Sequence, residues 1–279
     1  MARSLGRVMV RLGVIGGTGL IELTAAGEFS EQGLTVSQSH HLTVSTPYGA
    51  VPLHAMTMTA ADGTVHELVF LQRHHQGNGH GCPPHIINHR ANMRAMEDAN
   101  LDLVVAVCSV GTLHPNFPPG TVGLAHQYID FTGVACTFHD GSSRFTSATT
   151  PFSPAHNSFL EPLLRQAQGL SDQQRLLFTY WLTAGPQFET PAEVDAIERL
   201  GGDMVGMTMP REAKLALELS LPYVAICISS NWAAGREPGD ASKALNHEEV
   251  SAQANDRLKP IMACLAALLN EEKMMPSTD

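Results

Sequence analysis

The sequence predicts an α/β protein made of a single domain, in which helices flank a mixed central β-sheet. Three observations indicate this fold class. Short apolar runs rich in β-branched residues alternate along the chain with amphipathic runs of helical period. Small, hydroxylic or charged residues follow the apolar runs, as they do at the ligand-binding edge of an α/β sheet. Finally, 279 residues, 43% of them apolar, suffice for one core, and no change in composition divides residues 1–279.

Composition also narrows the location and the partners. The formal net charge of −10 leaves no broad basic face of the kind that nucleic acid requires. A basic start that is broken at Arg11 does not fit a signal peptide, and no apolar run reaches the roughly 18 residues that a membrane span needs. Five scattered cysteines without a CxxC pair predict reduced thiols and a cytoplasmic location.

The first predicted strand, residues 12–15, runs into the sequence Gly16, Gly17, Thr18 and Gly19. Glycines and a threonine at a strand end can present backbone N–H groups and a hydroxyl to an anion. A plain tight turn is an equal alternative, because the pattern lacks both the last glycine of the dinucleotide fingerprint and the lysine of a phosphate loop.

Residues 33–71 alternate as two or three strands and lead into the stretch 73–92, around which the other motifs are arranged. That stretch holds five histidines, two arginines and three glycines but no acidic residue, so it predicts a pocket for a small anion. Two prolines predict a helix over residues 85–97, with His85 and His89 on one face. Zinc is the minor alternative for these histidines, since the stretch offers no carboxylate.

The middle of the chain predicts three further strands with polar ends. Ser109 follows a strand at residues 101–108 that we expect to be buried on both faces. A strand at residues 120–129 precedes the polar stretch 130–157, whose length is typical of a functional or interface loop. The third strand covers residues 176–183.

Phe188 and Glu189 follow that third strand, and a capping box of Thr190 and Glu193 starts a helix that runs to about residue 200. An aromatic ring beside a carboxylate suits a planar heterocycle that donates an N–H group. A core phenylalanine beside a solvated glutamate is the alternative.

The last third of the chain predicts five further elements. In order, they are a strand at 203–206, a turn at Met207 and Thr208, a helix at 210–219, a buried strand at 222–230 ending at Asn231, and an amphipathic helix capped by Asn246.

Six motifs in register resemble the trimeric purine nucleoside phosphorylase and methylthioadenosine phosphorylase family, over about residues 12–270. They are IGGTGL (15–20), RH (73–74), PPHxxNxRAN (83–92), GPQFETPAE (185–193), GDMVGMT (202–208) and the strand that ends at Asn231. The resemblance implies phosphorolysis, in which inorganic phosphate attacks the anomeric carbon of a purine nucleoside and releases the base, without cofactor or metal. It also implies a homotrimer in which part of residues 138–152 closes a neighbour's site.

The resemblance also implies a role for each residue that matches a family motif. The implied phosphate ligands are Thr18, Arg73, His74, Ser109 and Thr208. The implied nucleoside contacts are Met207 at the ribose, His247 at its 5′ end, and Phe188, Glu189 and Asn231 at the base; His74 and Asn231 are the implied catalytic residues.

Asn231 and Glu189 favour 6-oxopurines as substrates. An amide can accept from N7–H and donate to the 6-oxo group, and a carboxylate can accept from N1–H. Methylthioadenosine phosphorylases tend to lack this glutamate and to have aspartates where this chain has Asn231 and Ala233. A 6-aminopurine preference stays open, as does a non-catalytic purine or phosphate binder. His247 fits a 5′-hydroxyl, whereas residues 231–235 resemble S-methyl-5′-thioinosine phosphorylases, whose 5′ region is apolar.

Three departures from the family pattern affect the anion end. The stretch between Arg73 and His80 is two residues longer than in the family. His89 replaces a tyrosine, and Arg211 stands before Glu212 where the family generally has proline.

Overall fold

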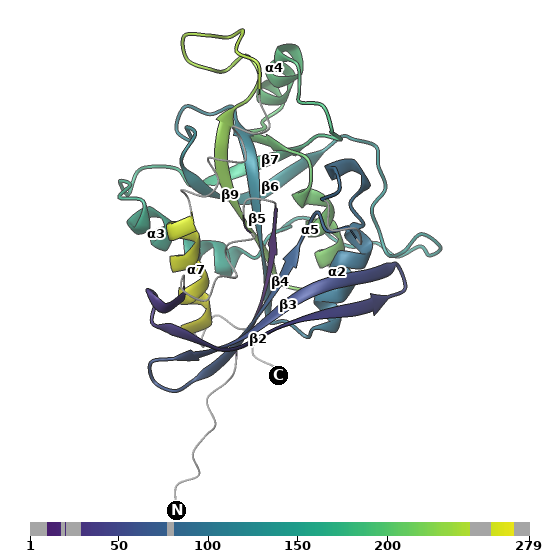
Figure 1. Cartoon of the computed structure of the whole chain (residues 1–279). Coiled ribbons are helices and arrows are strands. Elements are labelled where there is room, and N and C mark those ends of the chain that lie inside the picture. Colours follow the sequence, from purple (N-terminus) through teal and green to yellow (C-terminus); the bar gives the residue numbers. More distant parts are fainter. Residues whose placement is uncertain (1–9, 18–19, 21–28, 77–80, 246–257, 271–279) are drawn as a thin grey trace, which may run out of the picture.

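The computed structural model describes residues 10–17, 20, 29–76, 81–245 and 258–270 (Figure 1). Nine strands form one sheet in the order β2-β3-β4-β1-β5-β8-β7-β6-β9, and a further pairing of β5 with β9 closes the last five strands into a ring. The strands are β1 (Arg11–Gly16), β2 (Leu34–Thr46), β3 (Gly49–Ala60), β4 (Val65–Gln72), β5 (Leu103–Thr112), β6 (Val122–Asp130), β7 (Leu177–Leu182), β8 (Met204–Gly206) and β9 (Tyr223–Trp232).

The sheet is mixed, as predicted, and its central strands are parallel. β1 runs parallel to both β4 and β5, and β5 runs parallel to β9. Gly16 at the end of β1 is in register with Gln72 at the end of β4. Because parallel strands end at the same edge, the residues that follow β1, β4 and β5 come together there. The prediction of two or three strands over residues 33–71 is also confirmed, since β2, β3 and β4 form two successive antiparallel pairs.

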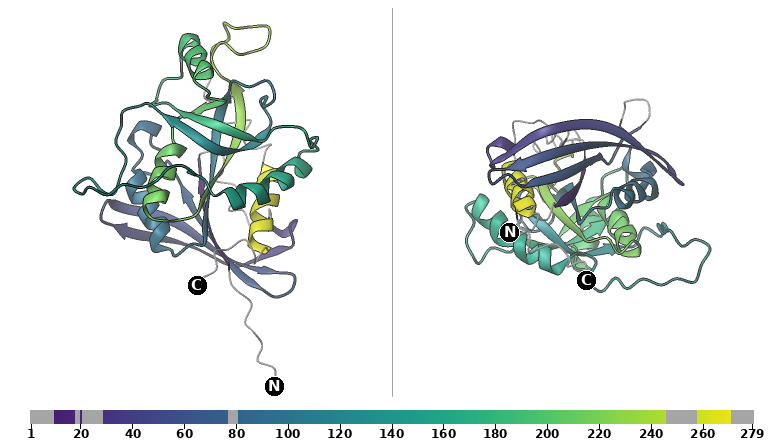
Figure 2. Two further views of the ribbon diagram at one scale, coloured as in Figure 1. Left: turned by 180° about the vertical axis from the view of Figure 1, so that it is seen from behind. Right: turned by 90° about the horizontal axis from the view of Figure 1, so that it is seen from below.

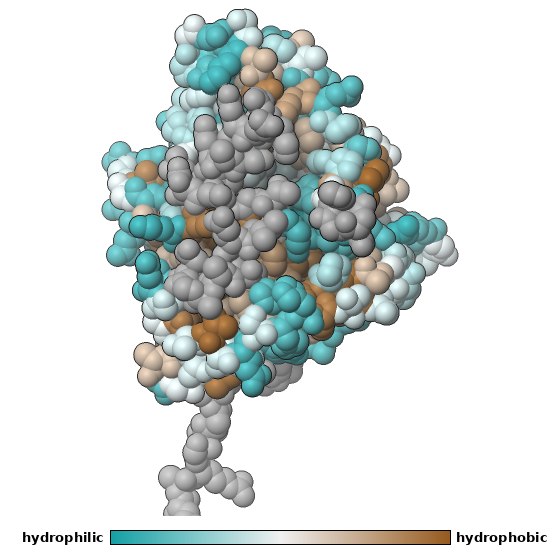
Figure 3. All heavy atoms as spheres, viewed as in Figure 1, coloured by the Kyte–Doolittle hydropathy of each residue, from teal (hydrophilic) through white to brown (hydrophobic). Residues whose placement is uncertain are grey.

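Helices cover the sheet on two sides. α3 (Pro154–Ala167) and α7 (Leu258–Asn270) lie together on one side, while α2 (His89–Asp98) and α5 (Met209–Glu218) lie on the other, as Figures 1 and 2 show. α4 (Pro191–Arg199) stands at the end of the molecule beside the loop that follows β9. In the space-filling view this end is largely hydrophilic (Figure 3).

β5 separates two apolar cores. Leu103, Val105 and Val107 contribute to the core with α3 and α7, whereas Val104 and Ala106 contribute to the core with α2 and α5. Successive side chains of a strand point to opposite faces, so a strand between two cores must be apolar throughout. The expectation that this strand is buried on both faces is therefore confirmed.

The helix predicted over residues 85–97 begins later than expected. Pro84–Ile86 form only a 3-10 turn, and the chain is extended at Ile87. α2 then starts at His89, because the side chain of Asn88 accepts from the backbone N–H of Ala91 and caps the helix. His85 and His89 therefore do not share one helical face, and the prediction that they do is wrong.

The stretch 130–157 is a loop only as far as residue 153, and α3 then begins with Pro154 at its first turn. No helix is predicted for this stretch from the sequence, although Leu160 and Leu164 are buried on one side of it. The helix predicted from Asn246 is described only as α7, since residues 246–257 lie outside the described part of the chain.

Candidate active site

A cavity of about 520 Å³ opens where the parallel strands end. Its walls come from the turn after β1, the segment after β4, the ends of β5, β8 and β9, and the segment before α4. It gathers eight of the ten residues that the sequence singles out: Arg73, His74, Ser109, Phe188, Glu189, Met207, Thr208 and Asn231. The other two, Thr18 and His247, lie outside the described residues, while Gly17 lines the cavity.

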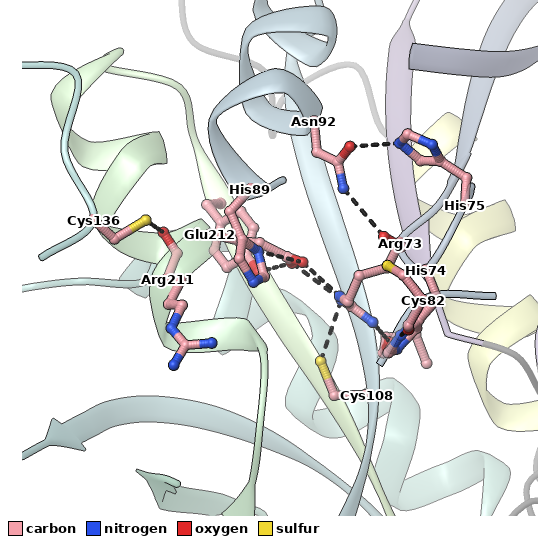
Figure 4. A network of polar contacts seen from close by, with 12 residues as sticks. Arg73, His74, His75, Cys82, His89, Asn92, Cys108, Cys136, Arg211 and Glu212 are labelled. Atoms are coloured by element: carbon pink, nitrogen blue, oxygen red, sulfur yellow. Dashed lines mark hydrogen bonds and ion pairs between the residues drawn. The ribbon is translucent and has the colours of Figure 1, made fainter. Parts of the chain in front are cut away.

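Arg73 is only 2% exposed, and a carboxylate holds its guanidinium (Figure 4). Its Nε donates to Oε1 of Glu212 at 2.5 Å and its Nη2 to Oε2 at 3.0 Å, while its Nη1 donates to the carbonyl of Val107 at 3.0 Å. Such a paired fork fixes the guanidinium in one orientation. The guanidinium of Arg73 is therefore held in one orientation at the cavity wall, and Glu212 balances part of its charge.

Glu212 is fully buried and is the ion-pair partner of Arg73. The hydroxyl of Tyr223 donates to its Oε2 at 2.9 Å. Burial raises the pKa of this carboxyl group, but the charge and hydrogen bonds of Arg73 outweigh burial and the net pKa is lowered. Glu212 is thus an anion, and it lies 139 residues from Arg73 in the sequence.

His74 is oriented by the loop that follows it. Its Nδ1 lies 2.8 Å from the carbonyl of Cys82, so Nδ1 must carry the proton and donate it. Asn92 connects the same segment to α2, because its Nδ2 donates to the carbonyl of Arg73 at 3.2 Å and its Oδ1 lies 2.7 Å from Nε2 of His75. The asparagine that ends the PPHxxNxRAN motif therefore fixes the backbone that carries Arg73 and His74.

Glu189 is held in place by Thr183, whose hydroxyl donates to Oε1 of Glu189 at 2.7 Å. Burial raises the pKa of Glu189, and the hydrogen bond from Thr183 partly offsets that rise. The predicted capping box is present, with the side chain of Thr190 accepting from the backbone N–H of Glu193 and the reverse bond also made. The start of α4 therefore fixes the segment that carries Phe188 and Glu189.

The amide of Asn231 has one defined orientation. Its Nδ2 donates to the carbonyl of Trp232 at 2.7 Å, and its Oδ1 lies 2.9 Å from the hydroxyl of Ser230, which donates to it. A carbonyl can only accept, so the contact with Trp232 assigns nitrogen and oxygen. One N–H and one lone pair of the amide stay available for a ligand.

The cavity thus combines cationic side chains on one wall with polar groups that can form hydrogen bonds to the edge of a heterocycle. Among the described residues, no group of three or more histidine, cysteine or acidic side chains is arranged to hold a metal ion. All five cysteines are unpaired thiols. No helix in the described part of the chain is long and apolar enough to cross a membrane.

The model of one protein family, described as the phosphorylase superfamily, matches residues 11–270. This chain belongs to that superfamily. The family expected from the six sequence motifs is confirmed, and so is its mixed α/β fold.

Two curated relatives of this phosphorylase are similar over nearly its whole length. A 6-oxopurine nucleoside phosphorylase of Pyrococcus furiosus is 35% identical, with 95% of this chain and 96% of the relative covered. A probable S-methyl-5′-thioinosine phosphorylase of Methanothermobacter thermautotrophicus is 32% identical, covering 94% and 85%.

A solved structure gives the same result for the fold of this phosphorylase. The crystal structure of a methylthioadenosine phosphorylase from an antarctic soil metagenomic library matches with a TM-score of 0.75 and 26% identity, over 95% of this chain and 88% of the other. A methylthioadenosine phosphorylase from Schistosoma mansoni, 23% identical with a TM-score of 0.75, shares the fold.

Proposed function

We propose that this protein catalyses the phosphorolysis of purine nucleosides, or of their 5′-methylthio analogues, and that it prefers 6-oxopurines as leaving bases. One observation carries the proposal: a single cavity joins the cationic segment at Arg73 and His74 to the pair Glu189 and Asn231. A reaction between an anion and a nucleoside needs both kinds of neighbour in one enclosed space. Membership of the phosphorylase superfamily supports the same reaction class.

In this proposal phosphate binds among Arg73, His74, Ser109 and Thr208, with Thr18 as a further ligand. Arg73 and His74 balance the charge of the anion, and the two hydroxyls donate to its oxygens. Attack at the anomeric carbon forms the bond to phosphate as the bond to the base breaks. The sugar carries positive charge in between, so the bound anion stabilises the transition state, and positioning supplies the rest of the rate enhancement.

The base leaves as a neutral purine because its N7 gains a proton from solvent as the glycosidic bond breaks. Asn231 is built to stabilise that product, because its Oδ1 can accept from N7–H while its remaining N–H donates to a 6-oxo group. Glu189 can accept from N1–H in its ionised form. The names of the Pyrococcus and Methanothermobacter relatives, which refer to 6-oxopurine and thioinosine substrates, support this preference.

At the ribose, Met207 lines the cavity and gives the sugar an apolar surface. Ala233, buried and lining the same cavity, stands where a methylthioadenosine phosphorylase tends to have an aspartate. We assign His247 to the 5′ end of the sugar, and the choice between a 5′-hydroxyl and a 5′-methylthio group is left to the experiment below.

We further propose that the enzyme works as a homotrimer in the cytoplasm, with no nucleic-acid or membrane partner and no cofactor besides phosphate as co-substrate. The unpaired thiols support a reducing compartment. Exposed phenylalanines on the loop between β6 and α3 support assembly, since such side chains are normally covered.

The test incubates the purified protein with inosine, guanosine, adenosine, methylthioadenosine and methylthioinosine, each with and without phosphate, and quantifies the free base. We expect hypoxanthine and guanine release only with phosphate. The ratio of methylthio to hydroxyl substrates decides the 5′ group. Preferential adenine release would instead support a methylthioadenosine phosphorylase, and no release from any substrate would support a non-catalytic binder.

A further inference from the structure

A buried histidine lies behind the anion end of the cavity and has no part in the reaction described above. His89, the first residue of α2, is 5% exposed. Neither of its ring nitrogens has a hydrogen-bond partner in the described part of the chain. Its Nδ1 lies 3.7 Å from Oε1 of Glu212, which is beyond hydrogen-bond distance. Figure 4 shows that the imidazole of His89 and the guanidinium of Arg73 both approach the carboxylate of Glu212.

The groups that face His89 decide its charge. Glu212 and Arg211 come from α5, and Arg73 and His74 come from the segment after β4, whereas β2 and β3 contribute apolar side chains to the core beside α2. Burial lowers the pKa of His89, Glu212 raises it, and Arg73, Arg211 and His74 lower it, so that the pKa is about 4. The imidazole is therefore neutral near pH 7 while the cavity holds no anion.

A bound dianion changes this balance. Its charge offsets the repulsion that Arg73 and His74 exert on a protonated His89. A small movement would then let the protonated Nδ1 donate to Oε1 of Glu212. The carboxylate of Glu212 would then pair with two cations. Less of the positive charge of Arg73 would be balanced by Glu212, and Arg73 would attract the anion more strongly.

We propose that His89 is a positioning residue for the phosphate end of the site, which takes up a proton from solvent as the anion binds and acts on Arg73 through Glu212. The proton returns to solvent when the anion leaves. This inference rests on the proposed function, because it assumes that phosphate binds beside Arg73.

The expected effect has a definite sign. A group whose pKa is raised by a ligand makes that ligand bind more tightly at low pH, and the gain is lost as pH rises through the pKa of the complex. An anion beside Arg73 raises the pKa of His89 above the value of about 4 that it has in the empty site. Anion affinity should therefore be at least about twofold higher at pH 5.5 than at pH 7.5.

Sulfate is the suitable probe, because it stays a dianion over this pH range and needs no turnover. We would measure its dissociation constant by isothermal titration calorimetry at pH 5.5 and 7.5. The background is His74→Gln, which removes the histidine that lines the cavity in the described part of the chain. A gain at low pH should remain in that variant, because Arg73 and Arg211 still lower the pKa of His89, and it should disappear in His74→Gln/His89→Gln. A matched control is His74→Gln/His156→Gln, since His156 is also buried but lies in α3, on the other side of the sheet from α2.

A second measurement needs no substitution at the site. The ring resonance of His89 in the wild-type protein, labelled with ¹³C-histidine, is followed with pH in the presence and absence of saturating sulfate. We expect sulfate to raise the pKa of His89. An unchanged pKa, or a pH dependence of affinity that survives in the double variant, would overturn the proposal for His89 and leave the phosphate site intact. Failure of sulfate to bind, or to compete with phosphate, would contradict the phosphate site itself.

Discussion

At the scale of single residues, the pair of Arg73 and Glu212 decides how much positive charge the site offers to an anion. Substituting Arg73 with alanine should raise the Michaelis constant for phosphate at least about tenfold more than that for nucleoside, a loss of about 1.4 kcal/mol of phosphate-specific binding. The same change leaves a buried, uncompensated carboxylate and should cost about 3–5 kcal/mol of stability.

The two effects are separable with a second substitution. Arg73→Ala/Glu212→Gln removes the orphaned charge, so the free energy of unfolding should recover substantially while the Michaelis constant for phosphate stays high. Steady-state kinetics and urea unfolding check both results. Equal changes in the two Michaelis constants would mean that Arg73 is a structural residue only.

Asn231 decides which purine edge the site accepts. Asn231→Asp places a carboxylate oxygen where Nδ2 now donates to the carbonyl of Trp232 at 2.7 Å, so the new side chain must hold a proton to avoid repulsion. Because that proton is donated to Trp232, the other oxygen can accept from a 6-amino group, but the acid has no N–H left to donate to a 6-oxo group. We expect the adenosine-to-inosine ratio of kcat/KM to rise at least about tenfold, or about 1.4 kcal/mol. An unchanged ratio would count against the assignment of Asn231 to the base.

The lowered pKa of the buried His89 also predicts that the protein loses stability in acid. Its pKa of about 4 in the folded protein lies below its ordinary value of 6.5, so the unfolded chain binds the proton more readily. The contribution of His89 to the free energy of unfolding should therefore be fully present above pH 6.5. It should fall as pH decreases towards 4, by about 2 kcal/mol at pH 5. Urea unfolding at pH 7.5 and pH 5 measures the loss, which His89→Gln should reduce. An equal loss in both proteins would show that other groups dominate.

At the scale of secondary-structure elements, α4 tests how far a capping box controls the base site. Thr190→Ala removes both the cap and its support for the segment that carries Glu189, and it should cost about 1 kcal/mol, equivalent to a fall in Tm of about 2–4 °C. The Michaelis constant for nucleoside should rise while that for phosphate stays constant. Thr190→Ser retains the hydroxyl acceptor and should behave as the wild type; a shift as large as that of the alanine variant would refute the role of the cap.

The elements that sequence predicts well are those whose signal is local. The capping box at Thr190 and the continuous apolar run of β5 are both explained by neighbouring residues. The sequence places the start of α2 too early because Pro83 and Pro84 resemble a helix start, whereas the side chain that caps the helix is that of Asn88. The ion pair of Arg73 with Glu212, and the pairing of β5 with β9 that closes the ring, join residues far apart in the chain. Neither leaves a periodic pattern in the sequence.

At the scale of the whole molecule, the loop between β6 and α3 is the feature that one chain does not explain. It projects from the body in both Figures 1 and 2. Phe131 is 74% exposed on it and Phe145 94%, although a large aromatic side chain is usually buried or covered. Exposed aromatic side chains on a polar, projecting loop are typical of an interface.

We therefore predict that light scattering will give three times the 30.0 kDa mass of one chain. Phe145→Ser should shift the assembly towards smaller species on dilution, because burial of the aromatic ring contributes about 1.5–3 kcal/mol at each of its copies. Leu200→Ser is the matched control, since Leu200 is also exposed, at 58%, but follows α4 rather than lying on the loop. If the loop closes a neighbour's site, kcat per chain should fall together with the mass as Phe145→Ser is diluted. A wild-type monomer with full activity would contradict both the trimer and a shared site, and would leave the reaction to the cavity of a single chain.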